Sequence, residues 1–242
     1  MNTYIIAEIA SNWEGSISKA KKLILESKKA GASAVKFQMW RASDLYSKDN
    51  PQWKIIKKSE LTFKKAEQLK KYADKQRIEF FCSVFYPEAV DHLESLGVKK
   101  YKIASRTCLL NDKYSLETLE SIAKTRKPVI ISMGMGGNKK QIMKIFSKNK
   151  ITFCYCISEY PAPFKKINWE EAIKYDGFSD HSIGIVAPFL FQLLKKRTRV
   201  KRLIIEKHVK LKNSKGPAAS PSITPEQLKE LSSNCRIIEK SV

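Results

Sequence analysis

Eight short apolar runs alternate with longer amphipathic stretches along the whole chain. The runs predict strands at residues 3–10, 33–39, 79–85, 101–105, 128–133, 151–157, 175–180 and 202–208. The other stretches predict helices near residues 16–30, 62–76, 87–96, 114–125, 138–148, 167–174, 184–196 and 224–239. Regular alternation of this kind indicates a parallel sheet with crossover helices, and eight repeats indicate closure into a barrel. We therefore predict an α/β fold, a TIM (β/α)8 barrel formed as a single domain over residues 1–242.

An open, doubly wound sheet is the alternative arrangement for alternating strands and helices. Its dinucleotide-binding members carry a glycine-rich turn directly after the first strand, and this chain has Ala10-Ser11-Asn12-Trp13-Glu14-Gly15 there instead. The closed barrel is therefore the better prediction. The longest irregular connection is residues 41–61, and we expect it to cover the mouth of the barrel.

The composition is that of an ordinary globular protein, with 43% hydrophobic and 29% charged residues. No apolar run is long enough to cross a bilayer, so we expect no membrane partner. The first strand begins almost at the N-terminus and leaves no room for a signal peptide, which favours a cytoplasmic location. The five cysteines are odd in number and have no zinc-site spacing, and we interpret them as reduced and buried.

The formal net charge of +22 suggests an anionic partner. Most of the paired lysines fall on the exposed faces of predicted helices or in loops. The one dense basic run, residues 195–202, lies between a helix and a strand, where we expect a surface turn at the bottom of the barrel. No zinc finger or RNA-binding motif accompanies this run, so we do not expect nucleic acid as a partner. Small phosphorylated or carboxylated metabolites are the simpler interpretation.

Nearly every predicted strand ends in polar or charged residues, although a barrel interior needs apolar side chains to fill it. The strand ends carry Glu8, Lys36, Gln38, Ser83, Lys102, Ser105, Arg106, Ser132, Ser158, Tyr160, Ser179, His181, Glu206 and His208. Active sites of such barrels lie at this end of the strands. Interior lysines such as Lys36 and Lys102 would be costly to bury without an anionic partner. With the neighbouring hydroxyl groups they indicate a site for a phosphate or a carboxylate.

Two of the three histidines, His181 and His208, end consecutive late strands, and each has an acidic residue close by in the sequence. Neutral imidazole is a common ligand of divalent metals, and nearby carboxylates orient it. If the two strands are neighbours, both rings can reach one ion that polarises a carbonyl group. A lysine could alternatively form a Schiff base with a carbonyl, but a Schiff-base enzyme needs no such histidine pair.

Several stretches of the chain resemble the sialic acid (N-acetylneuraminate) synthases and their nonulosonate relatives. The matching residues are 7–9 (AEI), 12–15 (NWEG), 31–38 (GASAVKFQ), 101–105 (YKIAS), 131–135 (ISMGM), 158–163 (SEYPAP), 178–184 (FSDHSIG) and 205–208 (IEKH). They follow one another in order across nearly the whole chain, which makes the resemblance far more specific than any single motif.

The resemblance implies an enzyme that joins phosphoenolpyruvate to the aldehyde of an open-chain acylamino sugar, with release of phosphate, to give a sialic-acid-like 2-keto acid. A divalent metal, manganese or magnesium, would polarise the aldehyde. The residues that the resemblance assigns are His181 and His208 for the metal, Lys36, Lys102, Ser105, Ser132, Ser158 and Ser179 for phosphoenolpyruvate, and Glu8, Gln38 and Tyr160 for the sugar or the reacting carbon. A homodimer is left open.

Four features depart from the family pattern. Trp13 stands where a histidine is usual, and Ala218-Ala219 stands where the family has Asp-His. The missing aspartate is expected near the sugar and the reactive water. Arg106 follows the stretch 101–105, where it could bind a further anionic group of the substrate or form a surface salt bridge. We also expect no antifreeze-like C-terminal domain, because the chain ends at Val242.

These departures leave alternatives to the synthase open. One is a related metal-dependent carbon–carbon lyase or aldolase that uses the same metal and a pyruvate-like ligand. Another is a non-catalytic paralogue that retains ligand binding, and a third is an anion-binding or nucleic-acid-binding surface protein, which the charge alone supports. The retained histidine pair and lysines favour the synthase.

Overall fold

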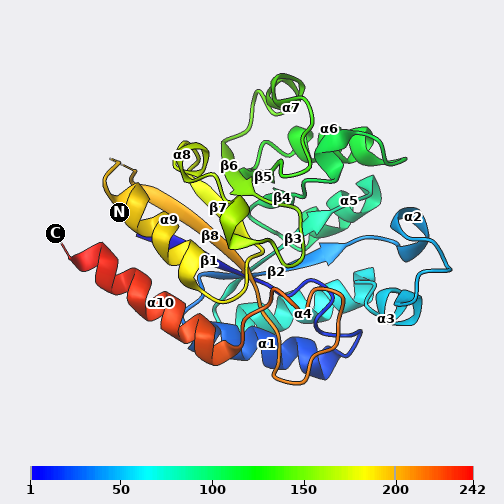
Figure 1. The fold of residues 1–242 in the computed structure, drawn as a ribbon. Helices are drawn as coiled ribbons and strands as arrows, with labels where there is room; N and C mark the ends of the chain where they lie inside the picture. The colour runs from blue at the N-terminus through cyan, green and yellow to red at the C-terminus, as the bar shows by residue number, and fades with distance from the viewer. Residues whose placement is uncertain (1, 199, 242) are drawn as a thin grey trace.

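The computed structural model describes residues 2–198 and 200–241, and its eight parallel strands form a closed barrel in chain order (Figure 1). The strands are β1 Asn2–Glu8, β2 Ala34–Met39, β3 Glu79–Val84, β4 Tyr101–Ile103, β5 Val129–Ser132, β6 Ile151–Cys156, β7 Gly177–Asp180 and β8 Arg202–His208. The predicted TIM barrel is confirmed, and each predicted strand is present within a few residues of its expected bounds. Three residues of the predicted range 1–242 lie outside the described residues: Met1, Val242 and, in the basic run, Arg199.

Ten α-helices occur among the described residues. They are α1 Ile17–Lys29, α2 Ala42–Leu45, α3 Trp53–Lys58, α4 Phe63–Lys75, α5 Pro87–Ser95, α6 Ser115–Lys124, α7 Lys139–Ile145, α8 Trp169–Ala172, α9 Val186–Lys196 and α10 Pro225–Lys240. The eight predicted helices are confirmed. In the part of the chain that the structure describes, none of the helices combines the length and the apolar character that crossing a membrane requires.

The segment 41–61 differs from the prediction, because it contains the helices α2 and α3 instead of being irregular throughout. These helices have only four and six residues, which is too short for a helical period to appear in the sequence. Trp40, Ala42 and Ile56 form a small buried apolar cluster that anchors the segment. The segment therefore has a defined position beside the C-terminal ends of β2 and β3.

Every second residue of a strand faces the barrel axis, and the intervening residues face the helices. One buried apolar cluster, the apolar floor, consists of Ile6, Ala34, Phe81, Ile130, Cys154 and Ile204. Its members come from six different strands and fill the barrel interior below the strand ends. Polar side chains that face the axis therefore have to lie above this floor, toward the C-terminal ends of the strands.

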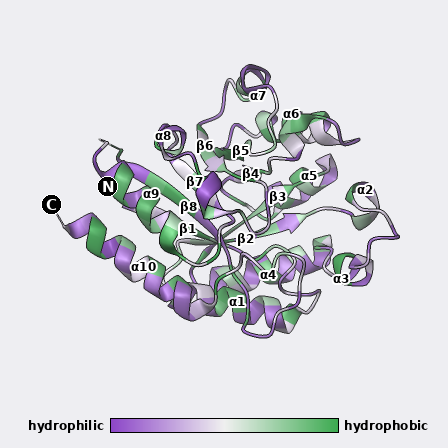
Figure 2. Cartoon of the chain, viewed as in Figure 1, coloured by the Kyte–Doolittle hydropathy of each residue, from purple (hydrophilic) through white to green (hydrophobic). Residues whose placement is uncertain are grey.

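A larger apolar core lies between the outside of the barrel and the surrounding helices. Phe37 of β2 packs against Phe80 of β3, with 5.4 Å between ring centroids, and Trp13 meets the edge of Phe37 at 6.4 Å. On the opposite side, Phe178 of β7 lies 5.1 Å from Phe191 of α9. Figure 2 shows green and purple bands alternating along α1 and α10, as expected for helices with one face on this core and one face in water.

Two connections at the mouth of the barrel are tied together by hydrogen bonds. The side-chain amide of Asn12, after β1, donates to the carbonyl oxygen of Val209 and to the hydroxyl oxygen of Ser222, both at 2.8 Å. Glu14 accepts a hydrogen bond of 2.9 Å from the hydroxyl group of Ser214. The long connection between β8 and α10 is therefore held against the first loop and contributes to one wall of the mouth.

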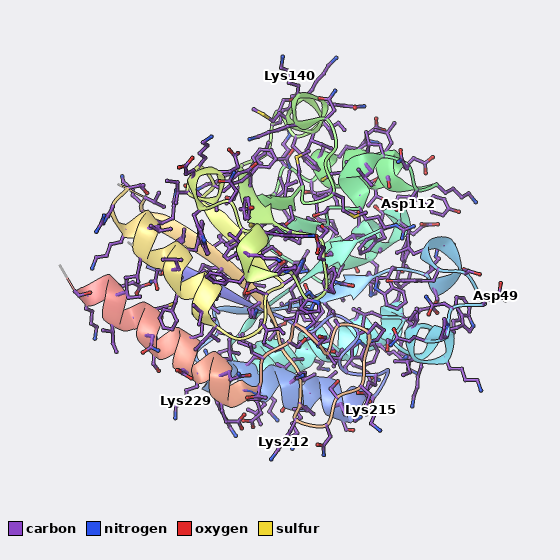
Figure 3. The ribbon with its side chains drawn as sticks, in the orientation of Figure 1. Asp49, Asp112, Lys140, Lys212, Lys215 and Lys229 are labelled. Carbon is purple, nitrogen blue, oxygen red and sulfur yellow. The ribbon has the colours of Figure 1, made fainter. Side chains whose placement is uncertain are left out.

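Lysines are distributed over the whole surface instead of forming one patch. In Figure 3 the labelled residues Lys140, Lys212, Lys215 and Lys229 point outward from separate parts of the molecule. The basic run is only partly the surface turn that we predicted, because Lys195 belongs to α9 and is buried. Its ammonium group lies 3.1 Å from Asp176 Oδ1, which ties α9 to the segment before β7.

Trp13 provides a test of the outer core, because it is fully buried among aromatic residues. We expect Trp13→Ala to lower the free energy of unfolding by about 3–5 kcal/mol through lost contacts and a cavity. Leu116→Ala on α6, where the side chain is largely exposed, should change it by less than about 0.5 kcal/mol. Guanidinium denaturation of both variants measures the difference, and similar losses in the two would contradict the assignment of Trp13 to the core.

Candidate active site

The C-terminal ends of the strands surround a cavity of about 370 Å³. Its deep part is lined by residues that lie above the apolar floor, which we name the polar layer: Glu8, Lys36, Ser83, Lys102, Ser132, Cys156, Ser179 and Glu206. Six of them follow a floor residue of the same strand by two positions. Two positions further on stand seven residues that we name the mouth layer: Ala10, Gln38, Phe85, Ala104, Ser158, His181 and His208. The period of two thus places His181 above Ser179 and His208 above Glu206, one layer nearer the opening than the lysines of β2 and β4.

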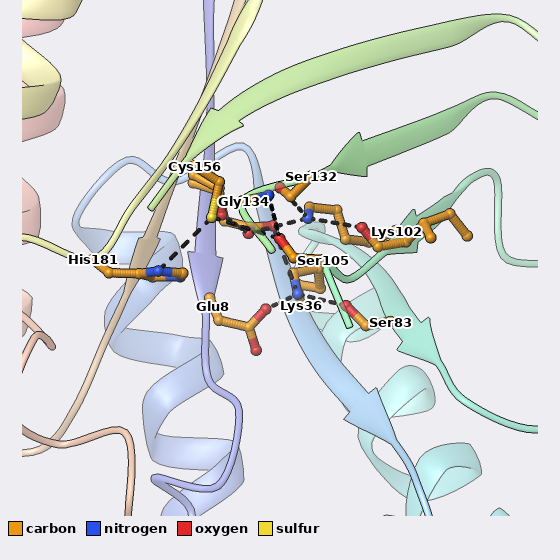
Figure 4. A network of polar contacts seen from close by, with 12 residues as sticks. Glu8, Lys36, Ser83, Lys102, Ser105, Ser132, Gly134, Cys156 and His181 are labelled. Carbon is orange, nitrogen blue, oxygen red and sulfur yellow. Dashed lines mark hydrogen bonds and ion pairs between the residues drawn. The ribbon is translucent and has the colours of Figure 1, made fainter. Parts of the chain in front are cut away.

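Four buried charges meet in the polar layer (Figure 4 shows Glu8, Lys36 and Lys102). The ammonium nitrogen of Lys36 pairs with the carboxylate of Glu8 and lies 3.6 Å from Glu206 Oε2. The ammonium nitrogen of Lys102 lies 3.6 Å from Glu206 Oε1. Two cations and two anions therefore neutralise one another, and an incoming anionic ligand finds both ammonium groups within one small volume.

The ionisation of these groups follows from burial and from their mutual attraction. Burial would raise the pKa of Glu206, but Lys102 and Lys36 outweigh it and lower the pKa to about 2. Burial lowers the pKa of Lys36 to about 8, although Glu206 opposes the shift. Burial acts in the same direction on Lys102, but the charge of Glu206 more than compensates, and the pKa of Lys102 lies above its usual range. Of the two lysines, Lys36 is the one that can lose its proton near neutral pH.

Serine hydroxyl groups extend the cationic site. Lys36 donates a hydrogen bond of 2.7 Å to Ser83, and Lys102 donates one of 2.7 Å to Ser132. The hydroxyl oxygen of Ser105 accepts a hydrogen bond of 2.9 Å from the amide of Gly134, and Ser179 donates to Glu206. The structure thus brings the predicted serines 105, 132 and 179 together with both lysines, and Ser158 lines the same cavity at the mouth layer.

His181 and His208 face each other across the mouth layer, with 5.3 Å between ring centroids. His181 Nδ1 lies 2.7 Å from the carbonyl oxygen of Ile157, so this nitrogen carries a proton. Burial would lower the pKa of His181, but the contact with Cys156 raises it. Burial, aided by the charge of His181, lowers the pKa of His208 well below its usual value, so its ring is neutral. Among the described residues, His208 Nδ1 is a buried atom without a hydrogen-bond partner.

The histidine pair fits a divalent metal, because a neutral ring with an unsatisfied nitrogen faces a second ring whose tautomer is set by a carbonyl group. Within residues 2–198 and 200–241, no group of three or more His, Cys, Asp or Glu side chains is arranged to hold a metal. A metal at this place would therefore take two ligands from the described protein and the others from water or substrate. Open positions of this kind are what a catalytic metal requires.

A buried ion pair supports the histidines from behind. The ammonium group of Lys207 lies 2.6 Å from Asp180 Oδ2 and donates to the carbonyl oxygen of Ser182. Lys207 directly precedes His208, and Asp180 directly precedes His181. The pair thus joins the C-terminal ends of β7 and β8 and keeps the two rings opposite each other. Asp180, the acidic residue directly before His181, thus faces Lys207 and is not part of the cavity lining.

Tyr160, Gln38 and Arg106 lie nearer the opening of the cavity. The Tyr160 ring packs on His181 at 4.1 Å between centroids and meets the edge of His208 at 5.8 Å. Gln38 lines the cavity and accepts a hydrogen bond of 3.2 Å from the indole of Trp40. Arg106 also lines the cavity, but its guanidinium group is paired with a carboxylate of its own chain. These residues are thus placed beside the deep site without being part of its charge network.

The departures from the family pattern have different positions. Trp13 belongs to the outer core and is not part of the cavity lining, so the residue that replaces the usual histidine has a structural role. Ala218, which replaces the usual aspartate, lines the cavity together with Pro217. The carboxylate that was expected near the sugar is therefore absent from that wall in this chain.

Cys156 is the residue of the site that the sequence did not identify. We interpreted it as a buried small hydrophobe, and it is buried and unpaired, but it lines the cavity with its sulfur 3.8 Å from His181 Nδ1. Burial would raise the pKa of this thiol, but the contact with His181 lowers it. Its spacing of two from Cys154 on a strand that ends at the site was the available signal.

Comparisons with known proteins are consistent with this geometry. A model of the NeuB family matches residues 23–242. The N,N'-diacetyllegionaminic acid synthase of Campylobacter jejuni is 34% identical over 269 aligned positions, which cover 99% of this chain and 77% of the length of that synthase. An uncharacterized protein of Methanocaldococcus jannaschii is 37% identical, and the alignment covers 98% of this chain and 71% of the length of that protein. A crystal structure of N-acetylneuraminic acid synthetase from Leptospira borgpetersenii has a TM-score of 0.87 at 28% identity, covering 99% of this chain and 85% of the other.

The ion pair behind the histidines gives a stability test. Lys207→Met leaves the buried carboxylate of Asp180 without a cation beside it, and we expect the free energy of unfolding to fall by about 3–5 kcal/mol. The double variant Lys207→Met/Asp180→Asn should recover part of the loss, because no unpaired charge remains. Lys174→Met, which removes an exposed pair with Glu171, is the matched control and should cost less than about 1 kcal/mol. Equal losses in the two single variants, measured by urea denaturation, would reject the argument.

Proposed function

Because the chain belongs to the NeuB family, we propose that it is a phosphoenolpyruvate-dependent synthase that joins phosphoenolpyruvate to the aldehyde of an acylamino sugar. The product would be a nonulosonic, sialic-acid-like 2-keto acid, and inorganic phosphate would be released. The relatives include an N,N'-diacetyllegionaminic acid synthase, a pseudaminic acid synthase and an N-acetylneuraminate-9-phosphate synthase. The resemblance to such synthases implies the formation of a carbon–carbon bond, which is the reaction class that we assign.

One observation carries the proposal: the two ammonium groups of Lys36 and Lys102 line the same cavity as two facing imidazole rings, one layer deeper. Phosphoenolpyruvate has a phosphate and a carboxylate, and two ammonium groups with adjacent serine hydroxyl groups suit both. A site for a dianionic ligand alone would not need the histidine pair. A metal site alone would not need two buried lysines, which are costly to keep in a barrel interior.

In the proposed reaction, C3 of phosphoenolpyruvate forms a bond to the aldehyde carbon of the sugar, and the aldehyde oxygen becomes a hydroxyl group after taking up a proton. Water then adds to C2, and the C2–O bond to the phosphate breaks, so that phosphate leaves and a 2-keto acid remains. Lys36 and Lys102 hold the anionic groups throughout the reaction. Glu8, which accepts a hydrogen bond of 2.8 Å from the Ala10 amide, is fixed beside Lys36 and can hold or deliver a proton at that point.

His181 and His208 would hold Mn²⁺ or Mg²⁺, which when bound supplies polarisation of the sugar aldehyde. Tyr160 covers both rings from the opening and keeps water from their outer side. Gln38 faces the same volume from the opposite wall and offers an amide to the sugar hydroxyl groups. The order from the floor to the opening is then phosphoenolpyruvate, reacting carbons and sugar.

Ala218 favours a second candidate function, because the family aspartate is replaced in the cavity wall. If that carboxylate is needed for the attack of water at C2, the chain would act as a metal-dependent carbon–carbon lyase or aldolase on a pyruvate-like unit. Such an enzyme would form pyruvate from a 2-keto sugar acid without any release of phosphate. The two functions are therefore separated by the product that appears.

The synthase is tested by phosphate release from phosphoenolpyruvate with Mn²⁺ and a panel of acylamino sugars. We expect release that depends on both the metal and one sugar, together with a new 2-keto acid. His181→Ala and His208→Ala should each abolish it while the circular dichroism of the barrel is unchanged. His92→Ala is the matched control, because this third histidine stacks on Phe63 outside the cavity. Activity that persists in both site variants would reject the metal assignment. Pyruvate formed from a 2-keto sugar acid, in an assay without phosphoenolpyruvate, together with no phosphate release from phosphoenolpyruvate in the first assay, would favour the lyase.

The lowered pKa of Lys36 predicts a pH dependence. The ammonium form is present below a pKa of about 8 and is lost as the pH rises above it. We therefore expect kcat/KM for phosphoenolpyruvate to fall above pH 8, by about tenfold per pH unit at the limit. Lys36→Arg keeps its charge at all accessible pH values and should remove this decline, whatever its absolute rate. An unchanged decline in Lys36→Arg would assign it to another group.

A further inference from the structure

The N-terminal end of the barrel lies opposite the candidate active site. It is formed by the connections that lead from a helix into the next strand, and each strand from β2 to β8 is preceded by one of them. In a closed barrel of parallel strands, all these connections come to the same end and surround the barrel axis. Residues that are far apart in the sequence therefore share one end face.

Cations occur on all parts of the surface, but at this end carboxylates do not balance them. The only acidic residue of these connections is Asp176, and its carboxylate is paired with Lys195 of α9. We name six exposed cations of the connections the basic end face, because none of them forms an ion pair within residues 2–198 and 200–241: Arg77, Lys99, Arg126, Lys148, Lys150 and Lys201. The basic end face is thus a set of separate, uncompensated charges.

Helix dipoles do not account for these charges. A helix C-terminus carries a partial negative charge that favours a cation in the last helical turn, where Lys28 of α1 and Lys75 of α4 are found. The effect falls off within that turn. The members of the basic end face lie beyond the helix ends, so their positive charge needs another explanation.

Two members of the basic end face occupy backbone positions that favour glycine. Arg77 and Arg126 follow the C-caps of α4 and α6 with φ angles of 54° and 56°, in the left-handed region. At the corresponding positions after α1 and α5 the chain has Gly31 and Gly97. A residue other than glycine is strained there, and neither guanidinium group forms an ion pair in the described chain. The two arginines therefore indicate a role for the exposed charge outside the fold.

The basic end face offers charge without an apolar or aromatic anchor. None of the large hydrophobic residues that the described chain exposes lies in these connections. A single strand of RNA or DNA is held by a groove that follows its backbone and by aromatic rings that stack on its bases. Here the cations come from the connections before β3, β4, β5, β6 and β8, so they are spread around the axis. A flat layer of negative charge can contact all of them at once.

We propose that the basic end face docks on the surface of a lipid bilayer with anionic headgroups. The contact is electrostatic and reversible, because no apolar side chain enters the bilayer, and it requires no helix that spans the membrane. Docking at this end leaves the cavity at the opposite end of the barrel open to water. The inference does not depend on the proposed reaction.

Sedimentation with vesicles measures this docking. The two kinds of vesicle are phosphatidylcholine alone and equal parts of phosphatidylcholine and phosphatidylglycerol. We expect the partition coefficient at low ionic strength to be about tenfold or more higher for the anionic vesicles, and the preference to disappear in about 1 M salt. No preference for the anionic vesicles would overturn the inference. Release of the bound protein by an RNA oligonucleotide or a DNA duplex, at an equal concentration of phosphate groups, would overturn it in favour of nucleic acid.

Charge reversal tests whether this face, and not the net charge of +22, is responsible. The quadruple variant Arg77→Glu/Lys99→Glu/Arg126→Glu/Lys148→Glu should lower the partition coefficient for anionic vesicles by about thirtyfold or more. The double variant Lys99→Glu/Lys148→Glu leaves both strained positions unchanged and should lower it by about tenfold. Circular dichroism checks that both variants are folded.

The matched control makes the same change in net charge at the other end of the molecule. It is the quadruple variant Lys140→Glu/Lys212→Glu/Lys215→Glu/Lys229→Glu, which alters exposed lysines in the connection after β8 and in the first turns of α7 and α10 (Figure 3). The control should lower the partition coefficient by less than about threefold, because these charges lie far from a bilayer at the basic end face. Equal losses in the two quadruple variants would show that net charge alone drives the binding, and the inference would be rejected.

Discussion

The carboxylate of Glu206, held between the ammonium groups of Lys36 and Lys102, is the interaction on which the rest of the site depends. Two ammonium groups in a barrel interior could not stay charged without an anion close to both. Glu206 supplies that anion from β8, and Glu8 balances the second charge from β1. The folded chain can therefore keep two cations ready for an anionic ligand, and their charge is compensated when the ligand is absent.

The position of this network follows from the layers of the barrel. The apolar floor excludes water from below, and the mouth layer carries the histidines above. Under the proposed function, the anionic groups of phosphoenolpyruvate would lie at the polar layer, and the sugar aldehyde would lie at the level of the histidines. The ion pair between Lys207 and Asp180 joins the C-terminal ends of β7 and β8, so the two histidines that follow these residues stay opposite each other.

Much of the candidate site could be predicted because a parallel barrel brings all its strand ends to one place. Lys36, Lys102 and the two histidines were identified as polar residues where apolar ones were expected, and they do meet in one cavity. The short helices α2 and α3 were missed because four or six residues cannot display a helical period. Cys156 was taken for a core residue because the sequence does not show which strand face is turned to the axis near the opening.

The sequence by itself determined the order of strands and helices, the closure into a barrel and the residue types at the strand ends, because these depend on local periodicity and on the chain order of the elements. Only the tertiary structure decided the partners of the charged groups. Asp180 faces Lys207, Asp112 neutralises Arg106, and Trp13 packs in the outer core. Such pairings depend on distances of a few ångströms between side chains, which are set when the elements pack together and leave no periodic trace in the sequence.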